Sequence, residues 1–313
     1  MTTVNRQAKH LNRRHLLRAA ASGTLGFIAA RSFGETTANE NAMVQAGMAS
    51  DPHHVLKAAK WDMIQIDGSV LEKFQLQKEL GFDGMELISP AELDPGEVRR
   101  ASETTGMPVH GVVDVKHWEN RLSSSNPAQR ELGVSYLQQA IRDANSFGGF
   151  SVLLVPGRVT GDDETHDDVW NRSIPEIGKA LPLASRLGVR ILIENVWNGF
   201  CESPEQYRDY IDAIDSPWVG AYFDVGNCRK FGPSEQWIRT LGSRIVKLDC
   251  KDWSQADGFC KIGDGDVDWP AVRQALAEIR FSGWCTAEVP GGGREELADI
   301  SLRMDRVLKS ENA

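Results

Sequence analysis

Short apolar runs alternate with amphipathic stretches from residue 61 to the end of the chain, and this alternation restricts the fold more than any other feature. The runs are rich in β-branched and aromatic residues and show no polar alternation, which is typical of strands covered on both faces. The stretches between them repeat apolar residues at helical spacing. The predicted strands are Trp61–Ile64, Gly84–Ile88, Pro108–Val113, Ser151–Val155, Val189–Ile193, Val219–Phe223, Arg244–Leu248 and Trp284–Val289.

Eight strand–helix units over about 260 residues agree with the usual size of a (β/α)8 TIM barrel, about 250 residues. Ser203-Pro204 and Asp268-Trp269-Pro270 are typical helix starts, with a capping residue before an early proline. The alternative is an open doubly wound sheet. That fold favours a glycine-rich nucleotide loop after its first strand, and Ile66-Asp67-Gly68-Ser69 is not such a loop. The sequence therefore predicts an α/β fold, a single-domain TIM barrel over residues 53–313.

The first 34 residues differ in composition from the rest of the chain. Arg13 and Arg14 precede an uncharged, Ala/Gly-rich stretch over residues 19–30, the order of segments in a twin-arginine export signal. This stretch is too short for a membrane-spanning helix, which needs about 20 residues. We expect a signal peptide over residues 1–34, a linker over 35–52 and a periplasmic protein with no stable membrane span after processing. The alternative is a disordered basic tail on a cytoplasmic protein.

The charge and the cysteine content exclude some classes of function. A formal net charge of -9 argues against nucleic acid as a partner, because phosphate binding requires a basic face. The five cysteines form no CxxC pair and are odd in number, so we expect no disulfide framework. We therefore expect a small molecule as the partner. The sequence does not decide whether the chain forms a homo-oligomer.

Acidic residues follow each of the last four predicted strands. The carboxyl ends of barrel strands face the active site, and adjacent strands lie about 4.8 Å apart, so these side chains converge. Carboxylates at that spacing repel one another without a counter-ion. A single acid at such a place is more often a loop cap or an ion-paired residue, but four in succession predict a divalent metal site. An all-oxygen set favours Mn²⁺ or Mg²⁺, with Zn²⁺ or Co²⁺ as alternatives. The predicted ligands are Glu194, Asp224, Asp249 and Glu288.

Two lysines complicate this prediction. Lys247 and Lys251 stand at alternate positions around Asp249, so all three share one face of a regular strand. An inward Lys247 would neutralise Asp249 and compete with a metal. This pattern keeps open a non-catalytic, sugar-binding barrel, since a fold alone does not establish an activity.

The later strands also carry a family resemblance over about Trp61 to Leu308. The sequence resembles the xylose-isomerase-like TIM barrels, among them ketose 3-epimerases and sugar phosphate isomerases/epimerases. The resemblance rests on the order and spacing of several segments together. They are Ile193-Glu194-Asn195, Phe223-Asp224-Val225-Gly226-Asn227, Ile245 to Asp252, Ile262-Gly263-Asp264-Gly265-Asp266-Val267-Asp268-Trp269, and Gly283-Trp284 leading to Glu288.

The resemblance implies roles for the four acids. The family's metal ligands fall on Glu194, Asp224, Asp249 and Glu288, although the family usually has a histidine where Asp249 stands. In the epimerases, the first and last of these residues also form the acid/base pair, here Glu194 and Glu288. Their chemistry is proton abstraction next to a carbonyl through an enediolate, which a metal stabilises.

Five further residues are candidates for substrate binding. Glu86 ends a predicted strand and His110 lies within one, although a satisfied core histidine is an equal reading of the latter. Asn227 follows Asp224 closely and can contact a sugar hydroxyl or simply form a turn. Trp118, in a long loop, is the candidate for an aromatic lid, with loop packing as an equal alternative. Lys251 is the candidate for binding an anionic substrate, although such a lysine is more often a surface residue.

The sequence thus predicts a metal-dependent sugar isomerase or epimerase acting on a small-molecule sugar. A lyase acting on an oxidised sugar or glycoside would use the same enediolate and is the main alternative. A phosphodiesterase of the same fold fits poorly, since such sites use several histidines and the chain has seven, two of them in the leader. If the chain is exported, its substrate is more plausibly a free sugar, an oxidised sugar or a glycoside than a sugar phosphate.

Overall fold

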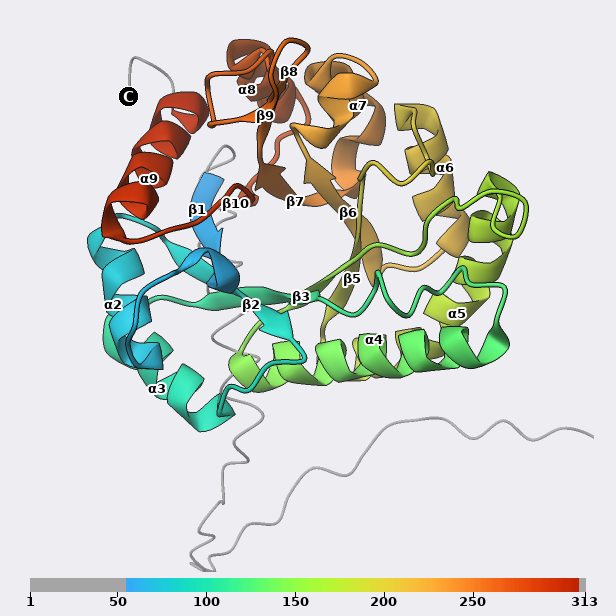
Figure 1. Ribbon diagram of the computed structural model, residues 1–313, viewed down its shortest axis with the longest axis horizontal. Helices are drawn as coiled ribbons and strands as arrows, with labels where there is room; N and C mark the ends of the chain where they lie inside the picture. Colours follow the sequence, from blue (N-terminus) through green and yellow to red (C-terminus); the bar gives the residue numbers. More distant parts are fainter. Residues whose placement is uncertain (1–54, 310–313) are drawn as a thin grey trace, which may run out of the picture.

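The computed structural model describes residues 55–309, in which eight parallel strands form a closed barrel (Figure 1). The strand order is β1-β10-β7-β6-β5-β4-β3-β2, so every strand pairs with its neighbour along the chain, and β10 closes the ring on β1. The predicted TIM barrel is confirmed. The strands are β1 (Val55–Lys60), β2 (Gly84–Ser89), β3 (Val109–Asp114), β4 (Ser151–Leu154), β5 (Arg190–Glu194), β6 (Val219–Asp224), β7 (Ile245–Cys250) and β10 (Gly283–Ala287).

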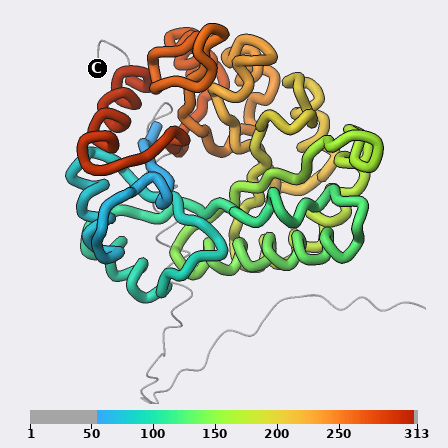
Figure 2. Tube along the Cα trace, in the orientation of Figure 1, coloured from blue at the N-terminus to red at the C-terminus, as the bar shows by residue number. Residues whose placement is uncertain are grey.

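Helices between the strands form the outer layer of the barrel (Figures 1 and 2). Ser203 and Asp268 cap α6 and α8 by accepting backbone N–H groups of the first turn, as the sequence predicts. Gly106, Gly148 and Gly188 end α3, α4 and α5 with positive φ angles. The helices are α2 (Val70–Glu79), α3 (Pro95–Thr105), α4 (Pro127–Phe147), α5 (His166–Leu187), α6 (Pro204–Ile214), α7 (Ser234–Leu241), α8 (Trp269–Glu278) and α9 (Arg294–Leu308), with short 3-10 segments η1 (Trp61–Met63), η2 (Asn227–Lys230) and η3 (Gly242–Arg244).

The first strand is not where the sequence places it. The predicted strand Trp61–Ile64 is wrong: the barrel strand is β1, and Trp61–Met63 forms η1. The two lysines of β1 make this strand hard to recognise in the sequence, because lysine is usually exposed whereas both of these are buried. Lys57 points outward, where its Nζ pairs with Asp305 Oδ1 at 2.8 Å, and Lys60 points into the barrel.

A hairpin after β7 is a second departure from the predicted pattern. Strands β8 (Asp252–Ser254) and β9 (Gly258–Cys260) pair antiparallel outside the barrel sheet. Buried Asp252 holds this region in place: its Oδ2 accepts hydrogen bonds from the Gly263 N–H and the Trp269 indole, both at 2.9 Å. The hairpin therefore stands at the same end of the barrel as the predicted acids.

The large apolar core lies between the strands and the helices, whereas the interior of the barrel has only a small apolar cluster around Leu153, Leu192 and Tyr222. The interior is thus left for polar side chains. The five cysteines, all among the described residues, form no disulfide. No helix within residues 55–309 combines the length and apolarity that a membrane span needs. The predicted leader and linker lie outside the described residues.

Candidate active site

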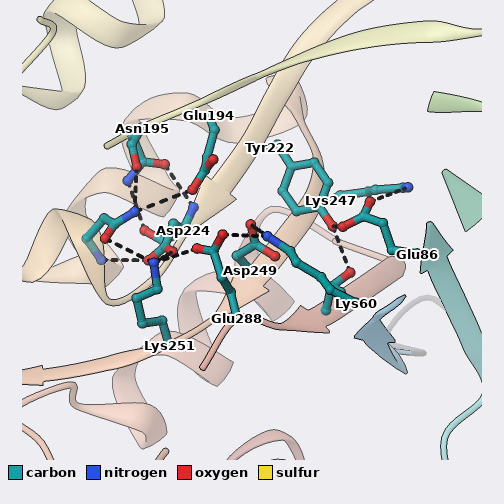
Figure 3. Close-up of polar contacts among 12 residues, drawn as sticks. Lys60, Glu86, Glu194, Asn195, Tyr222, Asp224, Lys247, Asp249, Lys251 and Glu288 are labelled. Carbon is teal, nitrogen blue, oxygen red and sulfur yellow. Dashed lines mark hydrogen bonds and ion pairs between the residues drawn. The ribbon is translucent and has the colours of Figure 1, made fainter. Parts of the chain in front are cut away.

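The four predicted acids converge at the carboxyl ends of the strands. Glu194, Asp224 and Asp249 lie in β5, β6 and β7, and Glu288 follows β10. Each offers a carboxylate oxygen, and these oxygens all lie within 4.8 Å of one another (Figure 3). The first three residues are buried, and the side chain of Glu288 is 29% exposed. We refer to these four residues as the acid ring.

Two lysines enter the acid ring from opposite flanks (Figure 3). Lys60 Nζ lies 3.1 Å from Asp249 Oδ2 and 2.6 Å from Glu288 Oε1. Lys251 Nζ lies 3.2 Å from Asp224 Oδ2 and 2.5 Å from Glu288 Oε2. Glu288 therefore receives one ammonium on each of its oxygens. Lys60 is not among the predicted site residues, because the predicted first strand begins after it.

The electrostatic environment separates the two glutamates of the ring. Burial, and then the charge of Glu288, raise the pKa of Glu194 well above its ordinary value. Burial acts on Glu288 in the same direction, but Lys60 and Lys251 outweigh it and hold the pKa of Glu288 below its usual range. Burial also raises the pKa of Asp224 to about 6 and that of Asp249 well above the ordinary value. The ring therefore combines one strongly ionised carboxylate with carboxyls that resist ionisation.

The ring has the composition of a divalent cation site. Four carboxylates and two ammoniums leave a formal charge of minus two, which one divalent ion neutralises. Asp249 Oδ1 is buried and accepts no hydrogen bond from the part of the chain that the structure describes. All of the donor atoms are oxygens, as hard cations such as Mg²⁺ and Mn²⁺ prefer. The residues present fit a metal of this class.

Asp224 is held in place by residues of the two segments that follow β5 and β6. Asn195 forms a reciprocal pair with its backbone, because Asn195 Oδ1 accepts the Asp224 N–H at 2.8 Å and Asn195 Nδ2 donates to the Asp224 carbonyl at 2.9 Å. The Asn227 N–H donates to Asp224 Oδ1 at 2.6 Å. The side chain of Asn227 also reaches Glu194 Oε1 at 3.4 Å, so this predicted residue lies within the site.

A buried polar layer lies deeper in the barrel. The Tyr222 hydroxyl donates to Glu86 Oε2 at 2.9 Å, and Lys247 Nζ lies 2.5 Å from His110 Nδ1 and 3.6 Å from Glu86 Oε1. Burial lowers the pKa of Lys247 to about 8, although Glu86 partly offsets this effect. Lys247 therefore faces Glu86 and His110, and Lys60 is the lysine that contacts Asp249. The layer consists of Glu86, His110, Tyr222, Lys247 and Thr286, each at most 1% exposed.

This layer bears on two predicted substrate contacts. Glu86 and His110 face the barrel interior as the sequence predicts, but the contacts that they make are with protein groups. Neither residue lines the cavity above the acid ring. Their role in substrate binding stays a prediction.

A cavity of about 380 Å³ opens above the acid ring, lined by Glu194, Glu288, Lys251 and Asn227. Its wall includes three half-exposed aromatic residues, and one of them is the predicted Trp118. The other two, Trp197 and Phe259, stack with ring centroids 4.6 Å apart. Neither is among the predicted site residues. Trp197 follows Glu194 by three residues, so its place after a strand end could have indicated it, whereas Phe259 lies in the β8–β9 hairpin, which the sequence does not predict.

Known proteins share this architecture. L-ribulose-5-phosphate 3-epimerase UlaE of Escherichia coli is 26% identical over 265 residues, which cover 78% of this chain and 93% of that protein. The D-allulose 3-epimerase of Methylomonas sp., solved in complex with D-allulose, superimposes with a TM-score of 0.68 at 15% identity, covering 83% of this chain and 99% of that one. The 3-keto-D-glucoside 4-epimerase of E. coli gives a TM-score of 0.68 at 15% identity, with 81% and 98% covered.

The sequence model of one family extends over most of the barrel. It matches residues 74–309, from α2 to the end of α9, and thus includes all four residues of the acid ring. The relatives with sugar-epimerase names agree with the resemblance that the strand-end motifs indicate. The chain belongs to the xylose isomerase-like TIM barrel family.

Proposed function

We propose that this chain is a metal-dependent sugar epimerase that moves a proton on the carbon next to a carbonyl group. The observation that carries the proposal is the acid ring itself, four carboxylates around one point at the floor of an aromatic-walled cavity. The names of the relatives support the proposal, since several of them are ketose 3-epimerases.

The acid ring would hold the metal ion, because its four residues bring carboxylate oxygens within 4.8 Å of one another and offer only oxygen donors. When bound, the ion supplies a positive charge that stabilises negative charge developing on substrate oxygens. Asn195 and Asn227 restrict the position of Asp224, so the ligand set is ordered by the backbone around it. Asp249 stands where the family usually has a histidine, which makes this set fully anionic.

Glu194 and Glu288 are the proposed acid and base. They come from β5 and β10, which β6 and β7 separate in the barrel, so they approach a substrate from different sides. One carboxylate removes the proton next to the carbonyl, which gives an enediolate, and the other carboxyl returns a proton to the opposite face. Lys60 and Lys251 orient Glu288 through its two oxygens. The configuration at that carbon is thereby inverted with no net gain or loss of atoms.

The cavity wall provides the binding groups for a sugar. Aromatic faces pack against the C–H faces of sugar rings, and Trp118, Trp197 and Phe259 present such faces around the opening. Asn227 and Lys251 lie between this wall and the acid ring, where they would donate hydrogen bonds to hydroxyl groups.

The experiment is solvent exchange followed by NMR. Free ketoses are incubated with the enzyme and Mn²⁺ or Mg²⁺ in D₂O, and deuterium is expected at the carbon next to the carbonyl, together with the epimer. Glu194→Gln and Glu288→Gln should each lower the exchange rate by a factor of about 100 or more, the usual contribution of general acid–base catalysis. Glu202→Gln, an exposed glutamate in the loop after β5, is the matched control. Exchange that survives in both ring variants would contradict the proposal.

A further inference from the structure

A second and larger cavity adjoins the acid ring. Its volume is about 940 Å³, and it lies between the β8–β9 hairpin, the loop after β10 and the first turns of α9. Lys251, Phe259 and Glu288 line both this cavity and the smaller one above the acid ring, so the two spaces meet at the reacting groups. In Figure 1, the hairpin and α9 flank the loop that leaves β10. A ligand seated on the acid ring can therefore extend into the second cavity.

The size of the two spaces exceeds what a single sugar ring needs. Ligand pockets commonly have volumes of about 300–1,000 Å³, and the smaller cavity alone reaches this range. The larger one adds apolar walls from Phe259, Ile262, Val289 and Ile300. Such walls pack against the C–H faces of a second ring.

The charges of the second cavity disfavour an anionic group. Its three cationic residues are already paired. Lys261 Nζ lies 2.9 Å from Asp299, and Arg303 lies within 3.0 Å of Asp299 and Asp264. Lys251 is paired with Asp224 and Glu288 of the acid ring. By contrast, Glu295 and Glu296 are exposed and form no ion pair among the described residues. Free carboxylates repel a phosphate but accept hydrogen bonds from hydroxyl groups.

The position of Glu295 and Glu296 also disfavours an anionic ligand in the second cavity. TIM barrels often bind phosphate between the loops after the last two strands and a helix N-terminus. In those barrels the helix is a short extra one. Here α9 is the first helix after β10, and its first turn carries Glu295 and Glu296. Their negative charge occupies the end of the helix dipole where an anion would bind.

We propose that the second cavity is a subsite for the second moiety of a neutral glycoside, whose first ring lies on the acid ring. This inference rests on the proposed function and names its substrate class. A glycoside has its anomeric carbon closed in an acetal, so the carbonyl next to the labile C–H bond must be a ketone on a ring carbon. The substrate class is therefore a non-phosphorylated glycoside with one ring hydroxyl oxidised to a ketone, and the glycosidic bond directs the second moiety toward α9.

The test compares two substrates that share one reacting ring. These are a disaccharide, such as cellobiose or maltose oxidised to a ketone in its non-reducing ring, and the methyl glycoside of the same oxidised ring. For the wild-type enzyme, kcat/KM of deuterium exchange should be at least tenfold higher for the disaccharide. A 6-phosphate on the methyl glycoside should bring no gain. A ratio near one, or a phosphate that improves kcat/KM, would overturn the subsite.

A variant that fills the second cavity tests whether the preference for the disaccharide arises there. Glu295→Trp places a large ring at an exposed position of α9 that lines the cavity, and it should reduce the ratio between the two substrates to about one, with the methyl glycoside unaffected. Glu205→Trp is the control, because Glu205 is exposed and occupies the same position in the first turn of α6. An unchanged ratio in Glu295→Trp would contradict the subsite.

Calorimetric binding separates this inference from the proposed function. If neither these substrates nor the free ketoses exchange deuterium, the epimerase proposal fails, and the subsite still predicts that the disaccharide binds at least tenfold more tightly than the methyl glycoside. If the free ketoses exchange and neither glycoside does, the substrate class proposed for the subsite is wrong. That difference should disappear in Glu295→Trp. Equal affinities in the wild-type protein would refute the subsite on their own.

Discussion

Lys60 explains how four carboxylates are gathered at one point without a prohibitive electrostatic cost. Burial opposes its charged form, yet Asp249 and Glu288 outweigh this effect and raise the pKa of Lys60 well above its ordinary value. Its ammonium therefore remains charged inside the barrel. Together with Lys251, it reduces the charge of the acid ring to a value that one divalent cation neutralises.

This balance makes a prediction for Lys60→Met. Removing one partner of a buried ion pair typically costs about 3–5 kcal/mol of unfolding free energy, because the remaining charge is uncompensated. A divalent cation would compensate that charge, so Mn²⁺ should raise the melting temperature of Lys60→Met more than that of the wild type. Thermal unfolding with and without Mn²⁺ measures both effects.

The same strand contains the control. Lys57 is equally buried and paired, but it lies outside the barrel against Asp305. Lys57→Met should be destabilised with no added response to Mn²⁺. Equal responses of the two variants would show that Lys60 has no relation to a metal site.

At the scale of single residues, the sequence predicts the four acids and places Lys251 among them, but it does not predict Lys60. Glu194, Asp224, Asp249 and Glu288 each lie at or just after the carboxyl end of a predicted strand, and strand-end geometry is enough to bring them together. Lys60 ends the strand Val-Leu-Lys-Ala-Ala-Lys, in which two lysines interrupt the apolar residues and are buried only through partners distant in the sequence. Such long-range pairing has no local signature.

At the scale of elements, the β8–β9 hairpin links the acid ring to both cavities. The sequence could not predict it, because two strands of three residues are too short for an apolar alternation to be recognised. Its position depends on one buried carboxylate, Asp252, which accepts hydrogen bonds from the loop that follows and from the start of α8.

We therefore predict that Asp252→Asn loosens residues 252–268. An amide turned toward N–H donors cannot accept all of their hydrogen bonds, and each bond to a charged group is worth about 1.5–3 kcal/mol. Hydrogen–deuterium exchange should become faster across this segment, with β1 to β6 unchanged. Asp257→Asn, exposed at the hairpin turn, is the control. Exchange rates equal to those of the wild type would contradict the assigned role of Asp252.

For the whole molecule, the eightfold alternation predicts the barrel well, since seven of the eight predicted runs overlap the strands that form it. The wrong position of the predicted first strand does not alter the predicted fold. The barrel still closes by pairing its first strand with β10, although that strand is Val55–Lys60. The boundaries of a fold are thus less predictable than its class.

The stability of the whole molecule should depend on pH through Asp114. This carboxyl is 1% exposed at the end of β3, and burial raises its pKa to about 7, although the Lys116 N–H partly offsets the shift. The native state thus binds more protons than the unfolded chain between about pH 4 and 7, so the free energy of unfolding falls as the pH rises through that window, by up to about 4 kcal/mol. Asp114→Asn should remove this contribution of Asp114, so that the variant loses less stability between pH 5 and pH 7.5 than the wild type; Glu194, Asp224 and Asp249, whose pKa values are also raised, contribute equally to both proteins. Urea unfolding at pH 5 and pH 7.5 measures it, with Asp67→Asn on the surface as the control.

We also propose that the chain is exported through its twin-arginine segment. Arg13→Lys/Arg14→Lys should retain the precursor inside the cell, because the pathway recognises the arginine pair. Fractionation of cells that express the full chain provides the measurement, and Arg6→Lys, outside the pair, is the matched variant. Unchanged localisation of the paired variant would refute export by this route.

The proposed function requires that the acid ring bind one divalent metal ion for chemistry on a sugar. Elemental analysis of the purified protein tests it most directly, alongside calorimetric binding of a sugar. We expect about one equivalent of Mn, Mg or a related divalent metal per chain, lost in the Glu194→Gln/Glu288→Gln double variant. Protein that contains no divalent metal, and whose sugar affinity is untouched by the double variant, would contradict it.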